Sequence, residues 1–275
     1  MASRLRAAGC VFAEDEARLL VAAARTATEL EAMTSRRVGG EPLELVLGYA
    51  EFCGIRIGLA PGVFVPRRRT EFLVRLATER IGRNQAGGVG AHRVLVDLCC
   101  GSGAIAAAAL TLARSITGSA RLEAHAADLD PAAVACAMRN LGPLGGHVYQ
   151  GDLFRPLPAA LVGRVSVLVA NVPYVPTREI ELLPAEAREH ESRLALDGGA
   201  DGLDVLRRVA AESGDWLAPG GVLLTEVAER QAAAAARIVS RSGLRPRIAR
   251  DRELGAVVLI GTTLAKPADE GGAEG

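Results

Sequence analysis

Hydrophobic residues change their spacing along the chain near residue 94. Before that point, Leu, Ala and Met recur at helical spacing among Glu and Arg, which predicts a helix over residues 13–37. Short β-prone runs interrupted by Gly and Pro follow at 45–47, 55–59 and 63–65, and residues 70–81 again have the helical period. The first part of the chain is therefore expected to hold a small helical region, a β-hairpin region and a further helix.

After residue 94, short apolar runs alternate with helical patterns. The apolar runs predict seven strands, at 94–98, 122–127, 147–150, 165–170, 221–226, 246–249 and 256–260. Between them, helices are expected at 104–114, 131–141, 203–211 and 230–240. Strands that are apolar along most of their length and alternate with helices are typical of a parallel sheet covered on both faces. The fold class is therefore α/β.

Composition excludes several classes of protein. The chain is 49% hydrophobic, which is enough to form a hydrophobic core. Its 32 basic and 32 acidic residues give no net charge, so neither nucleic acid nor an anionic membrane is an expected partner. Five Cys without a C-x-x-C pair and four scattered His argue against a metal site or a disulfide scaffold. No signal peptide is apparent, and the most apolar stretch, 94–113, contains Asp97 and a Gly-Ser-Gly break. We expect a cytoplasmic protein without a membrane span.

A Gly-x-Gly turn, Gly101-Ser102-Gly103, joins the first of these strands to the following helix. Glycine lets the backbone approach a ligand closely, and the helix start offers free N–H groups. The pair of glycines also fits an ordinary tight turn, and Ala106 stands where a dinucleotide-binding turn would have a third glycine. Asp97 lies inside the apolar strand just before the turn, where a carboxylate needs a partner or a cationic ligand.

Acidic residues also follow the next two strands. Asp128 ends the second strand, where a carboxylate can bind both ribose hydroxyls of a nucleotide. Asp130 precedes a proline and is interpreted as the cap of the next helix. Asp152 follows the third strand and could face the base edge of an adenosine, although a simple turn aspartate fits equally well. A nucleoside ligand without a pyrophosphate suits this set, and S-adenosylmethionine is such a ligand.

The buried strand 165–170 ends in the turn Asn171-Val172-Pro173-Tyr174. The turn could be only a rigid loop, but it could also hold a planar NH₂ group. The side-chain oxygen of Asn171 and the carbonyl of Val172 would accept its two N–H bonds, while Pro173 stiffens the turn and Tyr174 stacks on the planar group. Catalysis would then consist of orientation and charge placement, without a strong base.

Together these motifs resemble class I S-adenosylmethionine-dependent methyltransferases, and more narrowly the PrmC/HemK family of protein-glutamine methyltransferases that act on peptide chain release factors. The resemblance covers residues 36–262 and includes R-R-V-G-G-E-P-L at 36–43, V-F-V-P-R at 63–67, the Gly-Ser-Gly and Asn-Val-Pro-Tyr turns, and A-L-D-G-G-A-D-G-L at 195–203. It implies a seven-stranded Rossmann-like sheet whose last strand is antiparallel, preceded by a small N-terminal helical domain and a β-hairpin linker.

The resemblance also implies boundaries and site residues. Residues 1–62 would form the helical substrate-recognition domain and hairpin, 63–264 the methyltransferase domain, and 265–275 a disordered tail. The protein is expected to be a monomeric enzyme that methylates a release factor. The cofactor site expected from the motifs and the resemblance comprises Asp97, Cys99, Gly101, Ser102, Gly103, Asp128, Leu129, Asp152, Leu153 and Asn171, and the catalytic and substrate-binding residues are Asn171, Val172, Pro173 and Tyr174.

Three departures from the family pattern keep other acceptors open, one of which is a helical region before Arg36 that is short for the family. Val172 replaces the first proline of N-P-P-Y, and the family's P-R-P-[DE]-T-E reads P-R-R-R-T-E at 66–71. The run 67–69 could meet an acidic partner or the cofactor carboxylate, or simply be solvated. Glu226 could face the cleft, or be a helix-capping or solvated acid. The alternatives are an N-methyltransferase acting on another planar nitrogen, in a small molecule or a nucleobase, and a non-catalytic nucleoside-binding module.

Overall fold

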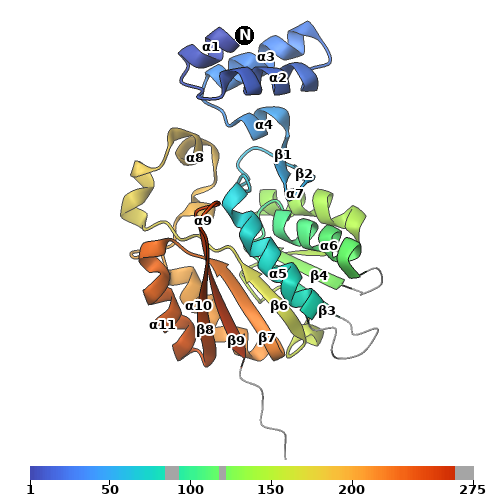
Figure 1. The fold of residues 1–275 in the computed structure, drawn as a ribbon, viewed down its shortest axis with the longest axis vertical. Helices are drawn as coiled ribbons and strands as arrows, with labels where there is room; N and C mark the ends of the chain where they lie inside the picture. The colour runs from blue at the N-terminus through green and yellow to red at the C-terminus, as the bar shows by residue number, and fades with distance from the viewer. Residues whose placement is uncertain (84–92, 118–121, 264–275) are drawn as a thin grey trace, which may run out of the picture.

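A computed structural model describes residues 1–83, 93–117 and 122–263 (Figure 1). Its main body is a seven-stranded sheet with the order β5-β4-β3-β6-β7-β9-β8. Only β9 runs antiparallel to its neighbours, so the expected antiparallel last strand is confirmed. All seven predicted strands are present: β3 (Arg93–Leu98), β4 (Leu122–Asp128), β5 (His147–Gln150), β6 (Val165–Ala170), β7 (Leu217–Glu226), β8 (Leu244–Asp251) and β9 (Ala256–Thr263).

Helices cover both faces of this sheet (Figure 1). The helices on one face are α5 (Glu71–Arg83), α6 (Ala104–Thr117) and α7 (Pro131–Leu141), and those on the other are α10 (Asp204–Trp216) and α11 (Ala232–Arg241). Side chains alternate along β3: Leu95 packs into the first layer, whereas Val94 and Val96 pack into the second. A strand buried on both faces must be apolar at nearly every position, which is why these runs were recognisable.

The N-terminal part consists of short helices and a hairpin that lie above the carboxyl edge of the sheet (Figure 1). Its elements are α1 (Ala2–Ala7), α2 (Ala13–Ala23), α3 (Ala27–Val38), α4 (Leu43–Leu47), β1 (Tyr49–Phe52) and β2 (Ile55–Gly58). A small core of its own includes Leu5, Leu20, Met33 and Val46. The division into domains at residues 62 and 63 stays a prediction, and the expected tail at 265–275 lies outside the described residues.

Three predictions for this part were wrong. The single helix over 13–37 is broken after Ala23, because the side chain of Thr26 accepts a hydrogen bond from the Glu29 amide at 3.1 Å and starts a new helix. The run 45–47 is helical instead of extended, since Pro42 precedes the turn and Gly48 ends it in the left-handed region with φ of 79°. Residues 63–65 form no strand either.

An insertion between β6 and α10 reaches up to the N-terminal helices. It contains a 3₁₀ segment (Thr177–Leu182), α8 (Ala185–His190) and α9 (Arg193–Leu196). Arg37 of α3 is largely buried and donates to Glu16 of α2 and to Glu186 of α8, each at 2.6 Å. The second arginine of the R-R-x-x-G-E-P motif therefore joins the helical part to the insertion.

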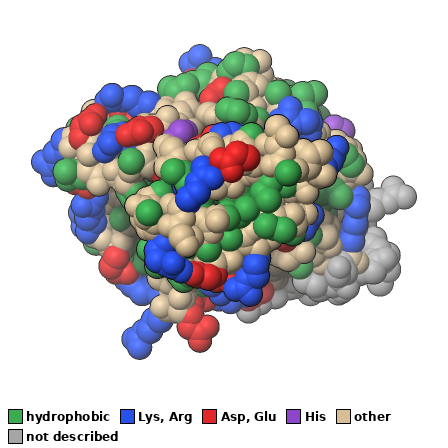
Figure 2. All heavy atoms as spheres, turned by 90° about the horizontal axis from the view of Figure 1, so that it is seen from above, with side chains coloured by type: hydrophobic (Ala, Val, Ile, Leu, Met, Phe, Trp, Pro, Cys, Tyr) green, Lys and Arg blue, Asp and Glu red, His purple; other side chains and the backbone are tan. Residues whose placement is uncertain are grey.

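The outer surface of the N-terminal helices is mixed in character. Figure 2, which looks down on this end, shows apolar side chains between charges of both signs. Val11 and Phe12 are among the exposed apolar residues there, at 85% and 68%. Among the described helices, none is long and apolar enough to cross a membrane.

Asn140 of α7 connects the hairpin to the sheet. Its Nδ2 donates to the carbonyl oxygens of Gly58 and Ser102 at 2.9 and 2.8 Å, and its Oδ1 accepts from the Gly58 amide at 2.9 Å. One side chain thus links β2 to the Gly-Ser-Gly turn.

We expect Asn140→Ala to lower the free energy of unfolding by about 2–3 kcal/mol, because two partly buried backbone groups lose their partner. Urea denaturation would measure the loss. Met138→Ala, an exposed position on the same helix, is the control and should change stability by less than about 0.5 kcal/mol. Equal losses in both variants would contradict this role of Asn140.

Candidate active site

A cavity of about 790 Å³ opens at the carboxyl edge of the sheet. Its walls come from the segments that follow β3, β4, β5 and β6, from the loop before α5, and from the insertion that carries α8 and α9. Of the predicted cofactor residues, Cys99, Gly101, Ser102, Asp128, Leu129, Asp152, Leu153 and Asn171 line it, as do Val172, Pro173 and Tyr174. Asp97 and Gly103 are not part of its wall. The carboxyl ends of parallel strands thus bring together segments that are distant in sequence.

The glycine turn depends on backbone conformations that favour glycine. Gly101 and Gly103 have φ of 55° and 74°. A Cβ at Gly103 would lie 3.1 Å from the Cβ of Ala137, so this glycine allows the turn to pack against α7. The Gly101 amide donates to Oδ2 of Asp128 at 2.8 Å, which ties the turn to the end of β4.

Asp97 supports the turn from beneath. It is fully buried, and its Oδ2 accepts a hydrogen bond from the Ala106 amide in the first turn of α6 at 3.2 Å. Its other oxygen, Oδ1, has no hydrogen-bond partner among the described residues. Burial raises the pKa of Asp97 to about 7, and the nearby charge of Asp128 adds to this effect. The carboxylate therefore positions the helix start and does not border the cavity.

The acid after β4 faces the cavity, and the next acid caps a helix. Asp128 accepts from the amides of Gly101 and Asp130, and burial raises its pKa. Asp130 accepts from the Ala132 amide at 2.8 Å, so its predicted role as the cap of α7 is confirmed. Asp152 also lines the cavity and is paired with Arg208 of α10 at 2.6 Å.

The turn after β6 presents an unused acceptor. Oδ1 of Asn171 is buried and accepts no hydrogen bond within the part of the chain that the structure describes. Val172 is buried in the same wall. A buried acceptor without a donor is costly unless a ligand provides the missing N–H group. Oδ1 of Asn171 can therefore accept a hydrogen bond from a donor that enters the cavity.

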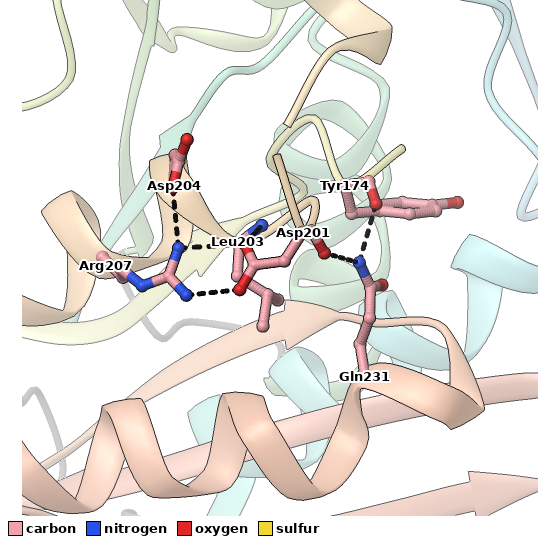
Figure 3. Close-up of polar contacts among 6 residues, drawn as sticks. All are labelled: Tyr174, Asp201, Leu203, Asp204, Arg207 and Gln231. Carbon is pink, nitrogen blue, oxygen red and sulfur yellow. Dashed lines mark hydrogen bonds and ion pairs between the residues drawn. The ribbon is translucent and has the colours of Figure 1, made fainter. Parts of the chain in front are cut away.

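The back of this turn is held through its carbonyl groups (Figure 3). Nε2 of Gln231 donates to the carbonyl oxygens of Tyr174 and Asp201 at 2.9 and 3.0 Å. A Cβ at Gly198 would lie 2.6 Å from the carbonyl oxygen of Pro173, so the Gly-rich motif at 195–203 lets two backbone segments touch. Sequence reasoning missed Gln231, because a single glutamine at the start of a helix carries no signal of this contact.

The ring of Tyr174 is held by a charged cluster. Oε1 of Glu226 accepts from Nε of Arg69 at 2.7 Å and from the Tyr174 hydroxyl at 3.2 Å, and Oε2 accepts from Thr70 at 2.9 Å. Arg69 also donates to the Tyr174 hydroxyl, and burial raises the pKa of Tyr174 to about 12. Glu226 is neither solvated nor on the cavity wall, since its side chain is 3% exposed behind Arg69.

The run of three arginines is only partly solvated. Arg67 pairs with the buried Glu191 at 2.6 Å, and Arg69 pairs with Glu226. Arg68 is exposed and makes no ion pair with the described residues, whereas Arg69 is paired although its side chain is 44% exposed. Within this run, a solvated and unpaired cation is therefore found only at Arg68.

Known proteins with similar sequences are methyltransferases. No family model matches the sequence. It is 37% identical over 213 residues to a release factor glutamine methyltransferase of Geobacter sulfurreducens (77% of this chain, 69% of that one), and 36% identical over 250 residues to one of Bradyrhizobium diazoefficiens (84% and 81%). It is also 38% identical over 208 residues to a 4-amino-L-phenylalanine/4-methylamino-L-phenylalanine methyltransferase of Streptomyces pristinaespiralis (76% and 68%).

Solved structures confirm the fold class. A 16S rRNA methyltransferase of T. thermophilus, solved with AdoMet and guanosine, aligns with a TM-score of 0.52 at 18% identity and covers 78% of this chain and 49% of that one. A ribosomal protein methylase of Lactobacillus delbrueckii subsp. bulgaricus aligns with a TM-score of 0.50 at 15% identity (76% and 85%). The sheet is therefore the Rossmann-like sheet of class I methyltransferases.

The raised pKa of Asp97 predicts a dependence of stability on pH. Because the folded protein binds this proton more tightly than the unfolded chain, the free energy of unfolding should fall as pH rises from about 4 to about 7. Asp97→Asn keeps an oxygen for the Ala106 amide and removes the charge. We expect it to be more stable than the unsubstituted protein at pH 8 by roughly 2–4 kcal/mol, with little difference at pH 4.5.

Urea denaturation at several pH values, without cofactor, measures the difference between Asp97→Asn and the unsubstituted protein. A difference that stays constant with pH would show that Asp97 is ionised in the folded protein.

Proposed function

The chain belongs to the family of release factor glutamine methyltransferases, and we propose from this membership that it transfers the methyl group of S-adenosylmethionine to a glutamine side-chain amide of a peptide chain release factor. The observation that carries the proposal is Oδ1 of Asn171, a buried acceptor without a donor on the wall of the cavity. A glutamine NH₂ group would provide that donor. A release factor as partner would also place the reaction in the cytoplasm, and the monomeric state stays a prediction.

The residues of the cavity fit an adenosyl cofactor. The backbone at Gly101 borders the cavity opposite Phe64, where a Cβ would narrow the space, and the cavity-facing carboxylate of Asp128 can accept both ribose hydroxyls. Leu129, Leu153 and Cys99 would provide apolar contacts for the base, with Asp152 at its edge. When bound, S-adenosylmethionine supplies an electrophilic methyl group on a positively charged sulfur.

The acceptor nitrogen would be oriented by the turn after β6. Its two N–H groups would donate to Oδ1 of Asn171 and to the carbonyl of Val172, which leaves the lone pair directed at the methyl group. One N–C bond forms, the sulfur–methyl bond breaks, and the nitrogen loses one proton to solvent. Tyr174 would stack on the plane of the amide.

Val172 in place of proline is compatible with this role. The carbonyl that accepts the N–H group is retained, and the Val172 side chain is buried in the core under the sheet edge. Gln231 also donates to the carbonyl of Tyr174, and the backbone at Gly198 passes close to the carbonyl of Pro173. Tertiary contacts thus supply rigidity that a second proline would otherwise provide.

A second acceptor class has specific support. The relative from Streptomyces pristinaespiralis is named for a free amino acid with an aromatic amine, and it is 38% identical to this chain, against 37% for the release factor enzyme of Geobacter sulfurreducens. An aromatic NH₂ group is planar and presents two N–H bonds, as an amide does. The same turn could therefore hold it.

We expect Asn171→Ala to lower kcat by about 10²–10³-fold, as loss of one preorganised hydrogen-bond partner does elsewhere. Cofactor affinity, measured by calorimetry, should persist because the ribose and base contacts are unchanged. Turnover close to that of the unsubstituted enzyme would exclude a catalytic role for the turn.

Mass spectrometry of a purified release factor incubated with the protein and S-adenosylmethionine tests the acceptor. We expect a glutamine of the release factor to gain one methyl group. A parallel incubation with 4-amino-L-phenylalanine tests the second class. If cofactor binds but neither these acceptors nor a cell extract receives labelled methyl groups, the protein is a non-catalytic binding module.

A further inference from the structure

The cavity is lined by side chains of both charges. Asp128 and Asp152 border the part assigned to the cofactor, whereas Arg69 lies next to Tyr174 and Arg67 lies over the ring of Phe64. The carboxylates that pair with these arginines, Glu191 and Glu226, are not on the cavity wall, and their side chains are only 1% and 3% exposed. The counter-charges thus lie behind the wall, and the guanidinium groups face the cavity.

Arg69 is held in place and still has donors to offer. Its Nε bonds to Glu226 at 2.7 Å, one Nη2 hydrogen bonds to the Tyr174 hydroxyl, and its guanidinium centre lies 5.9 Å from the centre of the Tyr174 ring. A guanidinium group has five N–H donors, so three remain beyond the contacts that the described residues make. The side chain is 44% exposed, and it borders the cavity.

We propose that Arg69 is a specificity-determining residue that selects acceptors carrying a carboxylate near the methylated nitrogen. This inference rests on the proposed function and deepens it. Tyr174 belongs to the same short turn as Asn171 and Arg69 donates to its hydroxyl, so a group bound by Arg69 would lie on the Tyr174 side of the acceptor nitrogen. A planar guanidinium fork binds a carboxylate through two parallel hydrogen bonds, and anchoring by Glu226 reduces the entropy lost on binding.

The other cations of the cavity are less suited to this role. Arg193 and Arg208 pair with Asp197 and Asp152, which themselves line the cavity and neutralise them there. Arg67 lies 4.9 Å over the ring of Phe64 and is not in contact with the Asn171–Tyr174 turn in the contacts described. In the family motif P-R-P-[DE]-T-E, which residues 66–71 resemble, an acidic residue occupies the position of Arg69. This chain therefore has a positive charge there instead of a negative one.

The test compares acidic and neutral acceptors. A peptide library with a central glutamine and varied neighbours, together with 4-amino-L-phenylalanine and its carboxamide, is incubated with enzyme and S-adenosylmethionine. We expect kcat/KM to be about tenfold or more higher for acceptors with a carboxylate than for neutral acceptors, because hydrogen bonds to charged groups are stronger than those between neutral groups. The variant R69M/E226Q, which removes both charges and so leaves no buried carboxylate unpaired, should lose this preference.

Controls separate specificity from damage. Arg68→Met removes the same charge one residue away, at an exposed position off the cavity wall, and should keep the preference. Arg69→Lys keeps the positive charge but lacks the planar guanidinium group, so it should lower the preference for acceptors with a carboxylate. This single variant tests the proposal if R69M/E226Q does not fold. A general structural defect would lower kcat/KM for both acceptor types and leave their ratio unchanged.

Each other outcome overturns the inference. Methylation that ignores acceptor charge, or a preference that persists in R69M/E226Q, contradicts the role of Arg69 while the proposed function stands. Calorimetry that shows about tenfold weaker S-adenosylmethionine binding in R69M/E226Q, with acceptor preference intact, would assign the bound carboxylate to the cofactor. Absence of methyl transfer to any acceptor would refute the proposed function, and this inference with it.

Discussion

The geometry of this site depends on how the short turn after β6 is held from behind. Gln231 bonds to the Tyr174 carbonyl, and the backbone at Gly198 passes so close to Pro173 that a side chain there would collide with it. These contacts use the outward-facing carbonyl groups of the turn and leave Oδ1 of Asn171 free on the inside. A buried acceptor can stay unpaired only in a frame that cannot relax around it.

Ion pairs with at least one buried partner join segments that are distant in the chain. Arg37 connects α3 to α8, Arg67 connects the loop before α5 to the insertion, and Arg69 connects the same loop to the end of β7. Such pairs add little net stability, since desolvation offsets much of the attraction, but they favour one arrangement over others. The rim of the cavity is thus assembled from several charged contacts, which explains how acceptor choice can change while the sheet is retained.

The strands of the sheet could be predicted because burial on both faces demands continuous apolar runs, as at 165–170. The N-terminal helices were harder, since their apolar stripe continues across the break at Ala24 and only the Thr26 cap reveals it. The apolar run 45–47 within Leu43–Leu47 resembles a short strand, yet the segment forms a helical turn between Pro42 and Gly48. Local propensity is weak where a segment is too short to show a period.

From the sequence alone, the α/β class and the order of strands and helices could be derived, and most of the site residues predicted from it line the cavity, because strand ends of a parallel sheet meet at one edge. The positions of Asp97 beneath the turn, of Gln231 behind it and of Glu226 behind Arg69 were decided only by the tertiary structure. These contacts join residues far apart in the chain, and neither period nor spacing encodes which distant backbone a single polar side chain will reach.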